Sequence, residues 1–246
     1  MSAESNHAGG AVEAERLASI AADSWYGKGA NAAMVRYSAR VFERFWHGRR
    51  CLEMGPAEGL MTPTLARAFP ELTVVEGAVS FCDDLRRRFP SITVVHALFE
   101  EYEPAERFDT IVLGHVLEHV ADPSALLARA GGWLTDDGRI CAAVPNARSI
   151  HRQAAVMMNL LPDEHALNQT DLHNGHRRVF DPETLRDAVR DAGLRVHHLG
   201  GYWLKPLSNG QIEATWTDEM LEAFMQLGER YPDVAAEIYV IAEARR

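Results

Sequence analysis

Cysteine is scarce in this sequence, and its three residues form no recognisable pattern. Cys51, Cys82 and Cys141 are far apart and lie inside apolar runs. Disulfide frameworks and metal-binding Cys-x-x-Cys knuckles both need cysteines at closer, repeated spacings. The sequence therefore predicts buried thiols in a reducing compartment, and we expect a cytoplasmic protein.

A secretion signal, a long apolar run and an excess of basic residues are lacking as well. Residues 1–10 are small and polar, and no apolar run approaches the roughly 20 residues that a membrane-spanning helix needs. The 246 residues include 25 Lys and Arg against 35 Asp and Glu, a formal net charge of −10. This balance argues against binding to nucleic-acid phosphates. We expect no membrane span and no nucleic-acid partner, and a small or cationic ligand fits better.

What the sequence does contain is an alternation of short β-branched runs with amphipathic stretches. Such an alternation predicts a doubly wound, mostly parallel α/β sheet, and the chain is long enough to bury one substantial core. The expected strands are residues 50–54, 72–76, 92–96, 110–114, 140–144, 194–200 and 236–242, and the expected helices between them are 60–69, 80–89, 123–134 and 184–192.

Two segments stand outside this alternation. Residues 1–48 contain two amphipathic stretches, so we expect an N-terminal helical cap that can also pair with a second copy of the chain. Residues 49–246 then form the main domain. Within that domain, residues 147–180 are rich in His, Asn, Arg and Met and have no strand pattern. They are predicted to be an inserted lid.

The most informative segment is the turn Gly55-Pro-Ala-Glu-Gly59, which follows the first strand directly. A glycine-rich turn at this place lets the backbone approach a ligand closely. The turn lacks the G-x-G-x-x-G spacing of dinucleotide-binding folds, and Glu58 would repel a phosphate. Glu53 and Glu58 instead suit a cationic ligand, for which the sulfonium and ammonium groups of S-adenosylmethionine are the obvious candidates.

The same turn resembles the first motif of class I S-adenosylmethionine-dependent methyltransferases, E/D-x-G-x-G-x-G, with Ala57 in place of the middle glycine. Glu76, at the end of the second strand, matches the acid that accepts hydrogen bonds from both ribose hydroxyls. Val116-Leu-Glu-His-Val-Ala-Asp-Pro123 is similar to the V-L-E-H-V-x-D-P of ubiquinone-biosynthesis-like O-methyltransferases. The resemblance covers residues 50–146 motif by motif.

The resemblance implies a seven-stranded, Rossmann-like methyltransferase fold with S-adenosylmethionine as cofactor. After the third strand, the family often has an Asp near the adenine, whereas this chain has Leu98 and Phe99 with Glu100 following. Tyr26 and Arg36 of the cap are expected to close over the cofactor. The expected cofactor residues of the main domain are Glu53, Gly55, Pro56, Ala57, Gly59, Glu76, Gly77, Leu98, Phe99, Glu100 and Gly114.

The methyl acceptor is expected to be a small molecule that is methylated on oxygen, with nitrogen of an amine or amino sugar as the alternative. An imidazole can take up a proton from such an acceptor near neutral pH. The candidate catalytic residues are His115, His119 and His176, and no metal is required. Packing or surface exposure would explain each of these histidines as well. The candidate acceptor-binding residues are Asn146, His151, Arg152 and His173.

Three other interpretations stay open. His115-x-x-Glu-His119 also spells the inverted zinc-protease pattern, but that site needs both histidines on an established helix and a distant third ligand. A nicotinamide-dependent oxidoreductase would need the missing glycine spacing. A non-catalytic module that only retains a cofactor would have no use for the histidine-rich lid.

Overall fold

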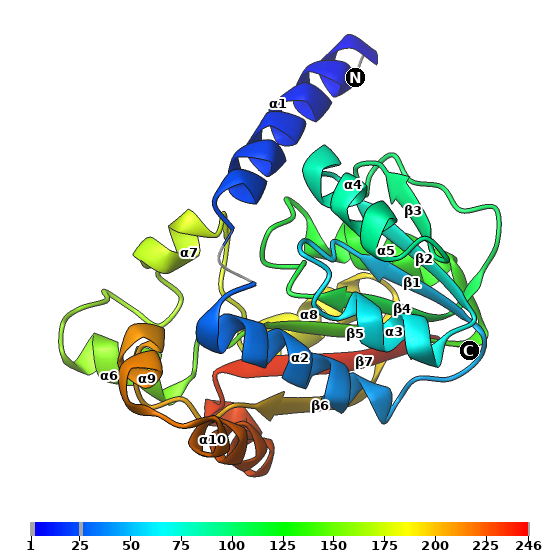
Figure 1. Cartoon of the computed structure of the whole chain (residues 1–246). Coiled ribbons are helices and arrows are strands. Elements are labelled where there is room, and N and C mark those ends of the chain that lie inside the picture. Colours follow the sequence, from blue (N-terminus) through cyan, green and yellow to red (C-terminus); the bar gives the residue numbers. More distant parts are fainter. Residues whose placement is uncertain (1–2, 25–26, 246) are drawn as a thin grey trace.

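A sheet of seven strands, in the order β3-β2-β1-β4-β5-β7-β6, forms the centre of the computed structural model, which describes residues 3–24 and 27–245 (Figure 1). Strands β1 to β5 pair in parallel, and β7 runs antiparallel to both of its neighbours. The predicted mostly parallel α/β fold is therefore confirmed. The strands are β1 (Arg50–Met54), β2 (Glu71–Glu76), β3 (Thr93–His96), β4 (Phe108–Gly114), β5 (Leu134–Pro145), β6 (Leu194–Tyr202) and β7 (Glu237–Ala244).

Helices cover both faces of this sheet. Figure 1 shows α2 in front of the sheet and α8 behind it. Among the helices of the described ranges, none is both long and apolar enough to cross a membrane. The helices are α1 (Ala3–Ala22), α2 (Gly29–Glu43), α3 (Thr62–Ala68), α4 (Val79–Arg88), α5 (Pro123–Gly132), α6 (Ile150–Met157), α7 (Gln169–His173), α8 (Pro182–Asp191), α9 (Asn209–Thr215), α10 (Asp218–Arg230) and the 3-10 turn η1 (Pro232–Val234).

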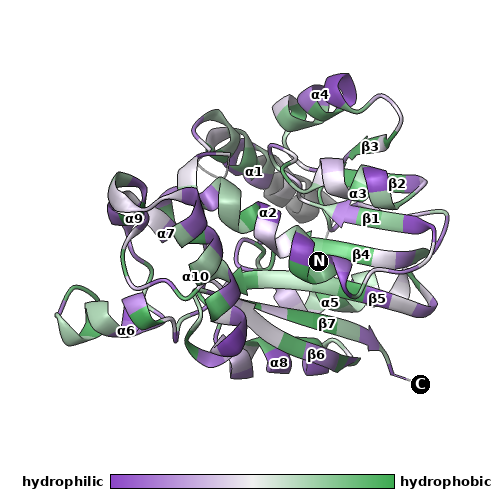
Figure 2. Cartoon of the chain, turned by 60° about the horizontal axis from the view of Figure 1, so that its bottom comes forward, coloured by the Kyte–Doolittle hydropathy of each residue, from purple (hydrophilic) through white to green (hydrophobic). Residues whose placement is uncertain are grey.

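Each face of the sheet has its own hydrophobic core, because successive side chains of a strand point to opposite faces. Leu52 and Ile111 pack in one core with residues of α5 and α8, whereas Cys51 and Val112 pack in the other with residues of α2 and α3. Figure 2 shows hydrophobic residues along the central strands and hydrophilic ones on outer helices such as α4. Burial on both faces explains why the sequences of these strands are nearly continuous apolar runs.

The segment inserted after β5 leaves the sheet and returns to it at a single point. Asn146 forms a β-bridge with Phe180, and the amide of Ala147 donates to the carbonyl of Phe180 at 2.6 Å. Between these ends, α6 and α7 lie beyond the carboxyl edge of the parallel strands (Figure 1). The insertion is therefore a helical excursion on the side of the sheet where ligands bind in folds of this class.

Residues 209–230, for which the patterns above predict no element, form α9 and α10. The start of α10 carries ordinary helix signals: the Thr217 side chain accepts the amide of Met220 at 3.3 Å, and Asp218 and Glu219 occupy the first turn. Acidic residues there complement the helix dipole. α10 packs against β6 and so closes the α2 side of the sheet.

Candidate active site

The turn after β1 needs glycine at two positions. Gly55 has φ +64° and Gly59 has φ +68°, a region that L side chains rarely adopt. A Cβ on Gly55 would lie 3.1 Å from both Phe99 Cζ and Val116 Cγ2, and a Cβ on Gly59 would lie 2.5 Å from Leu85 Cδ2. Ala57 also has a positive φ, +49°, where the resembling motif has glycine. Ala57 thus adopts a backbone conformation that glycine adopts more readily.

A cavity of about 390 Å³ opens at the carboxyl ends of β1, β2 and β4. This volume lies in the range of pockets that enclose a small-molecule cofactor. Of the residues that the sequence assigned to a cofactor, those lining the cavity are Gly55, Pro56, Ala57, Glu76, Gly77, Leu98, Phe99, Glu100 and Gly114.

Glu76 is the central acidic group of this cavity. Its Oε1 accepts a hydrogen bond from the amide of Ala78 at 2.8 Å, and its Oε2 accepts one from the amide of Ala57 at 3.2 Å. Burial raises the pKa of this carboxyl, while the two amides oppose the rise. A carboxylate held in this way keeps lone pairs directed into the cavity, where a diol can donate to them.

Glu53 lies behind the cavity wall. It lines a smaller adjoining space of about 20 Å³ together with Gly55 and Gly114. Its side chain is buried, and the Thr62 hydroxyl donates to its Oε2 at 2.7 Å. Burial raises the pKa of Glu53 to about 8. The carboxyl therefore holds a proton at neutral pH unless a cation approaches it.

His115 marks the point where β4 ends. Its φ is +60°, and its amide donates to the carbonyl of Ala143 at 3.0 Å. The buried ring is held by three partners: Nε2 lies 3.2 Å from the Tyr202 hydroxyl, and Nδ1 lies 3.5 Å from Glu118 Oε1 and 3.7 Å from Glu237 Oε2. Burial opposes a charge on the ring, but the two carboxylates outweigh it and raise the pKa of His115.

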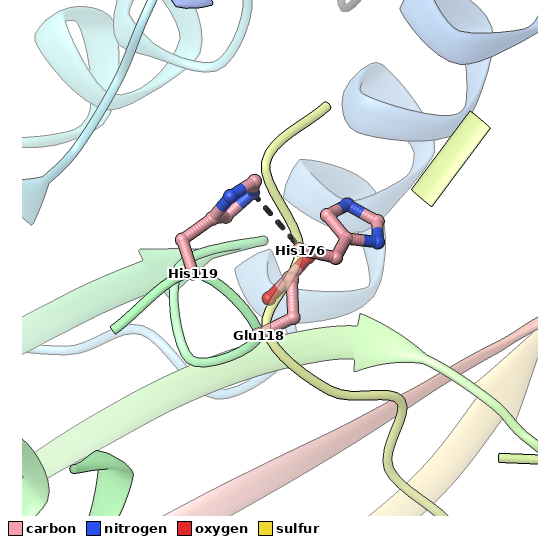
Figure 3. Close-up of side chains that lie close together, drawn as sticks. All are labelled: Glu118, His119 and His176. Atoms are coloured by element: carbon pink, nitrogen blue, oxygen red, sulfur yellow. Dashed lines mark ion pairs between the residues drawn. The ribbon is translucent and has the colours of Figure 1, made fainter. Parts of the chain in front are cut away.

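His119 and His176 meet beside Glu118 (Figure 3). The rings of the two histidines are 4.8 Å apart at an angle of 79°, and His119 Nε2 lies 4.0 Å from Glu118 Oε1. His119 lines the cavity. Burial lowers the pKa of His119 to about 4, so its imidazole is uncharged at neutral pH. His176 stands behind it and shares a hydrogen bond of 3.1 Å between its Nδ1 and Asp171 Oδ1.

The chain brings these histidines together through the returning end of the insertion. The amide of Arg177 donates to the carbonyl of Glu118 at 2.8 Å, so the two segments run side by side. The Arg177 guanidinium also donates to the carbonyl of His119 at 2.7 Å. Two residues 57 positions apart in the sequence, His119 and His176, thereby share one site.

Helix α1 supplies cavity residues that the sequence analysis did not single out: Glu13, Arg16, Leu17 and Ile20 line one wall. Their spacing of three, four and seven residues places them on one helix face, and this was the signal that could have identified them. Of the two cap residues that were singled out, Arg36 is exposed and absent from the described lining of the cavity. Tyr26 lies outside the described residues.

Two of the expected acceptor-binding residues, Asn146 and Arg152, have structural partners. The Asn146 amide donates to the carbonyls of Asp233 and Ala235 at 3.1 and 2.8 Å. Arg152 is buried, donates to the carbonyls of Glu164 and Ala166, and pairs with Asp171 at 3.0 Å. Buried polar groups need such partners, so Asn146 joins the end of β5 to the segment before β7, and Arg152 holds the lid together.

The two lid histidines have different surroundings. Burial lowers the pKa of His151 to about 3. His173 Nε2 lies 3.1 Å from the carbonyl of Asp23. Among the described residues that line the cavity, none of the four expected acceptor contacts is present: Asn146, His151, Arg152 and His173 are all set back from it.

Comparison with known proteins identifies the architecture. A family model described as "Methyltransferase domain" matches residues 26–199. The chain is 22% identical over 177 residues to the ubiquinone biosynthesis O-methyltransferase of Aeromonas salmonicida (strain A449), which covers 66% of this chain and 69% of that protein.

Two solved structures of methyltransferases have similar folds. One is the putative methyltransferase in complex with the Trm112 methyltransferase activator of Haloferax volcanii, with a TM-score of 0.65, 14% identity, and coverage of 94% of this chain and 98% of that one. The other is the glycopeptide N-methyltransferase MtfA complexed with (S)-adenosyl-L-methionine, with a TM-score of 0.55, 18% identity, and coverage of 85% and 86%. At these identities the likeness concerns the fold.

Proposed function

The chain belongs to the methyltransferase-domain family and uses S-adenosylmethionine, and from that premise we propose that it methylates an oxygen atom of a small-molecule acceptor beside His119. The observation that carries the proposal is the position of His119. Its imidazole lines the same cavity as the Gly55 turn and Glu76. A hydroxyl group that binds there lies beside an imidazole nitrogen, which can accept the hydroxyl proton as the methyl group is transferred.

The cavity suits the cofactor in shape and charge. Gly55 and Gly77 allow close approach of the backbone, Glu76 faces the ribose position, and Leu98 and Phe99 offer an apolar surface to the adenine. Among the described lining residues, carboxylates outnumber guanidinium groups: Glu13, Glu58, Glu76, Glu100 and Glu101 against Arg16 and Arg177. This negative lining favours a ligand that carries sulfonium and ammonium charges.

When bound, the cofactor supplies a methyl group on a positively charged sulfur. The protein's own task is to align the acceptor oxygen with that methyl group, exclude water and remove the acceptor's proton. α1 and the returning end of the insertion cover the cavity, since Arg16 donates to the carbonyls of Gly175 and His119 at 3.1 and 3.3 Å. Alignment then depends on the part of the cavity that His115 and His119 line.

Nitrogen is the second candidate acceptor atom, and one observation favours it. Glu118 and Glu237 are buried carboxylates beside His115, and burial raises the pKa of Glu237 to about 7. A cationic amine would stabilise such groups in their charged form. A protonated amine must lose a proton before its nitrogen can attack the methyl group. The end of the cavity near His115 and His119 could therefore remove a proton from either kind of acceptor.

The experiment is a calorimetric titration with S-adenosylmethionine and S-adenosylhomocysteine, followed by a screen of phenols, alcohols and amines with methyl-labelled cofactor. We expect one cofactor per chain and label transfer to a hydroxyl compound. His119→Ala should lower kcat by about 100-fold, the size of a lost proton-transfer function, with an unchanged Kd for S-adenosylhomocysteine. Full turnover in this variant would overturn the role of His119. His173→Ala, which alters a lid histidine set back from the cavity, is the matched control.

A further inference from the structure

Several buried polar atoms beyond the carboxyl edge of the parallel strands have no hydrogen-bond partner among the residues that the structure describes. They are Ser149 Oγ, His151 Nδ1, Trp203 Nε1 and Glu237 Oε2. Ser149, Trp203 and Glu237 are buried as whole residues. A buried polar atom without a partner costs free energy, and native proteins contain few of them. A group of such atoms in one place therefore calls for a polar molecule that supplies the missing partners.

Backbone hydrogen bonds bring the segments that carry these atoms together. The amide of Ala236 donates to the carbonyl of Trp203 at 2.8 Å. The amide of Asn146 donates to the carbonyl of Ala236 at 2.8 Å, and the amide of Ser149 donates to the carbonyl of Asn146 at 3.2 Å. The end of β6, the start of β7 and the start of the lid thus meet at one point, and the unpartnered atoms come from both sides of this junction.

Lys205 adds a cation to the same place. Its Nζ lies 4.8 Å from the centre of the Trp203 ring. Burial lowers the pKa of His151 to about 3, and the Lys205 ammonium adds to this effect. Burial raises the pKa of Glu237 to about 7, and the same ammonium opposes this rise. Such effects weaken with distance, so Lys205 lies near both side chains. We call Ser149, His151, Trp203, Lys205 and Glu237 the lid seam.

The lid seam adjoins the cofactor cavity at His115. Glu237 Oε2 lies 3.7 Å from His115 Nδ1, and His115 lines the cavity. The hydroxyl of Tyr202, the residue before Trp203, lies 3.2 Å from Nε2 of the same ring. A compound held in the lid seam can therefore extend past His115 into the cavity, so that one of its atoms lies beside His119 while the rest stays under the lid.

The lid seam offers hydrogen-bond donors and acceptors side by side. Trp203 Nε1 and the Lys205 ammonium donate, whereas the Glu237 carboxylate accepts. The Ser149 hydroxyl can do either. A hydroxyl group is likewise donor and acceptor at once, so a ring that carries several hydroxyl groups can satisfy all of these side chains. An apolar chain would leave the same atoms buried without partners.

We propose that the lid seam binds a polyhydroxylated ring, such as a sugar or cyclitol unit, as part of the methyl acceptor. This inference rests on the proposed function, because it names the class of compound that is methylated beside His119. It also makes His151 an acceptor contact, although that residue is set back from the cofactor cavity. In the reaction, the O–H and S–CH₃ bonds break, the O–CH₃ bond forms, the sulfur keeps the electron pair and the His119 imidazole takes the proton.

The test measures binding without turnover. The full chain, loaded with S-adenosylhomocysteine, is mixed with methyl glucoside, methyl galactoside, methyl mannoside, methyl rhamnoside and myo-inositol, and saturation-transfer NMR detects which of these probes binds. We expect saturation transfer to at least one probe. Its Kd should rise about tenfold in Glu237→Gln, which weakens a hydrogen bond to a charged group, and about threefold in Ser149→Ala. Glu243→Gln, near the opposite end of β7, is the matched control and should leave this Kd unchanged.

Binding of S-adenosylhomocysteine to each variant shows that it is folded. Ser149→Ala gives a second readout: its hydroxyl oxygen has no partner within the described residues, so its removal should not lower the free energy of unfolding in urea. A loaded chain that shows no saturation transfer to any probe, or equal Kd values in Glu237→Gln and Glu243→Gln, overturns the inference and leaves the proposed function standing. A chain that binds a probe as expected but transfers no methyl group to any hydroxyl compound overturns the proposed function alone.

Discussion

The carboxylate of Glu76, at the end of β2, accepts a hydrogen bond from the amide of Ala57, in the turn after β1, at 3.2 Å. The second oxygen of the same carboxylate accepts the amide of Ala78 at 2.8 Å. One side chain therefore fixes the shape of the turn and also lines the cavity. The strand end and the turn therefore form one unit at the cavity wall.

Replacement of Glu76 should accordingly abolish most cofactor binding. Glu76→Ala removes a carboxylate that can accept both ribose hydroxyls, and hydrogen bonds to charged groups contribute about 1.5–3 kcal/mol each. We expect Kd for S-adenosylhomocysteine to rise at least 30-fold in calorimetry. Glu71→Ala, at the exposed opposite end of the same strand, should leave Kd unchanged. Equal affinities in the two variants would refute the role of Glu76.

Glu53 should make the stability of the cofactor-free protein depend on pH. Its pKa is raised from 4.5 to about 8 in the fold, so between these values the folded state keeps a proton that the unfolded state has lost. The free energy of unfolding should therefore fall as pH rises through this window, by up to about 1.4 kcal/mol per pH unit, and the effect is complete above pH 8.

Urea denaturation at several pH values across that window measures this slope. Glu53→Gln keeps an acceptor for the Thr62 hydroxyl and cannot ionise, so its slope should be smaller and its stability near pH 8 higher. Glu103→Gln, which changes an exposed carboxylate, should behave as the unmodified chain does. An identical slope in Glu53→Gln and the unmodified chain would show that Glu53 is charged in the folded protein.

The parts of the fold that sequence patterns predicted are those that local rules determine. The turn at Gly55 and Gly59 needs positive φ, which glycine adopts readily, and Glu76 is the last residue of an apolar strand. Both features can therefore be predicted from the residues next to them in the sequence. The strand bounds agree to within a few residues, except that β5 begins six residues earlier, at Leu134. Apolar runs in a sheet that is buried on both faces are a strong local signal.

What the sequence could not predict depends on contacts between distant segments. His176 comes to lie beside Glu118 because Arg177 and Arg178 bond to the loop after β4. Arg152 resembles a binding residue in the sequence, yet the fold uses it to satisfy buried carbonyls. The spacing of the α1 wall residues shows that they share one helix face, but the place where that face packs follows from contacts with distant segments. α10 was missed although Thr217 and the acids after it mark its start.

Gly228 should be a strict requirement for the docking of α10. A Cβ there would lie 2.2 Å from the backbone nitrogen of Trp203, and backbone cannot give way as a flexible side chain can. We expect Gly228→Ala to lower the free energy of unfolding by about 1–3 kcal/mol in urea. Gly132→Ala, with no atom within 4 Å of the new Cβ, is the control and should cost nothing or stabilise slightly. Similar losses in both variants would contradict this account.

Arg16 should keep α1 closed over the cavity. Its guanidinium donates to the carbonyls of Gly175 and His119 and pairs with Glu13 at 2.6 Å. In Arg16→Ala we expect faster hydrogen exchange in α1 and several-fold faster release of S-adenosylhomocysteine, because two tethers of the helix are lost. Arg67→Ala removes an arginine of α3 that bonds locally to Thr64, and it should change neither rate. Unaltered exchange in Arg16→Ala would mean that Arg16 does not hold α1 over the cavity.

The most direct test of the central claim is the chemical identity of the methylated atom. The chain is incubated with S-adenosylmethionine carrying a ¹³C-methyl group and with matched phenol and amine acceptors, and the product is examined by carbon NMR. The chemical shift of the labelled carbon distinguishes a methyl group on oxygen from one on nitrogen. Our account predicts an O-methyl product whose formation is lost in His119→Ala and retained in His173→Ala. An N-methyl product, or equal turnover in both variants, would contradict it.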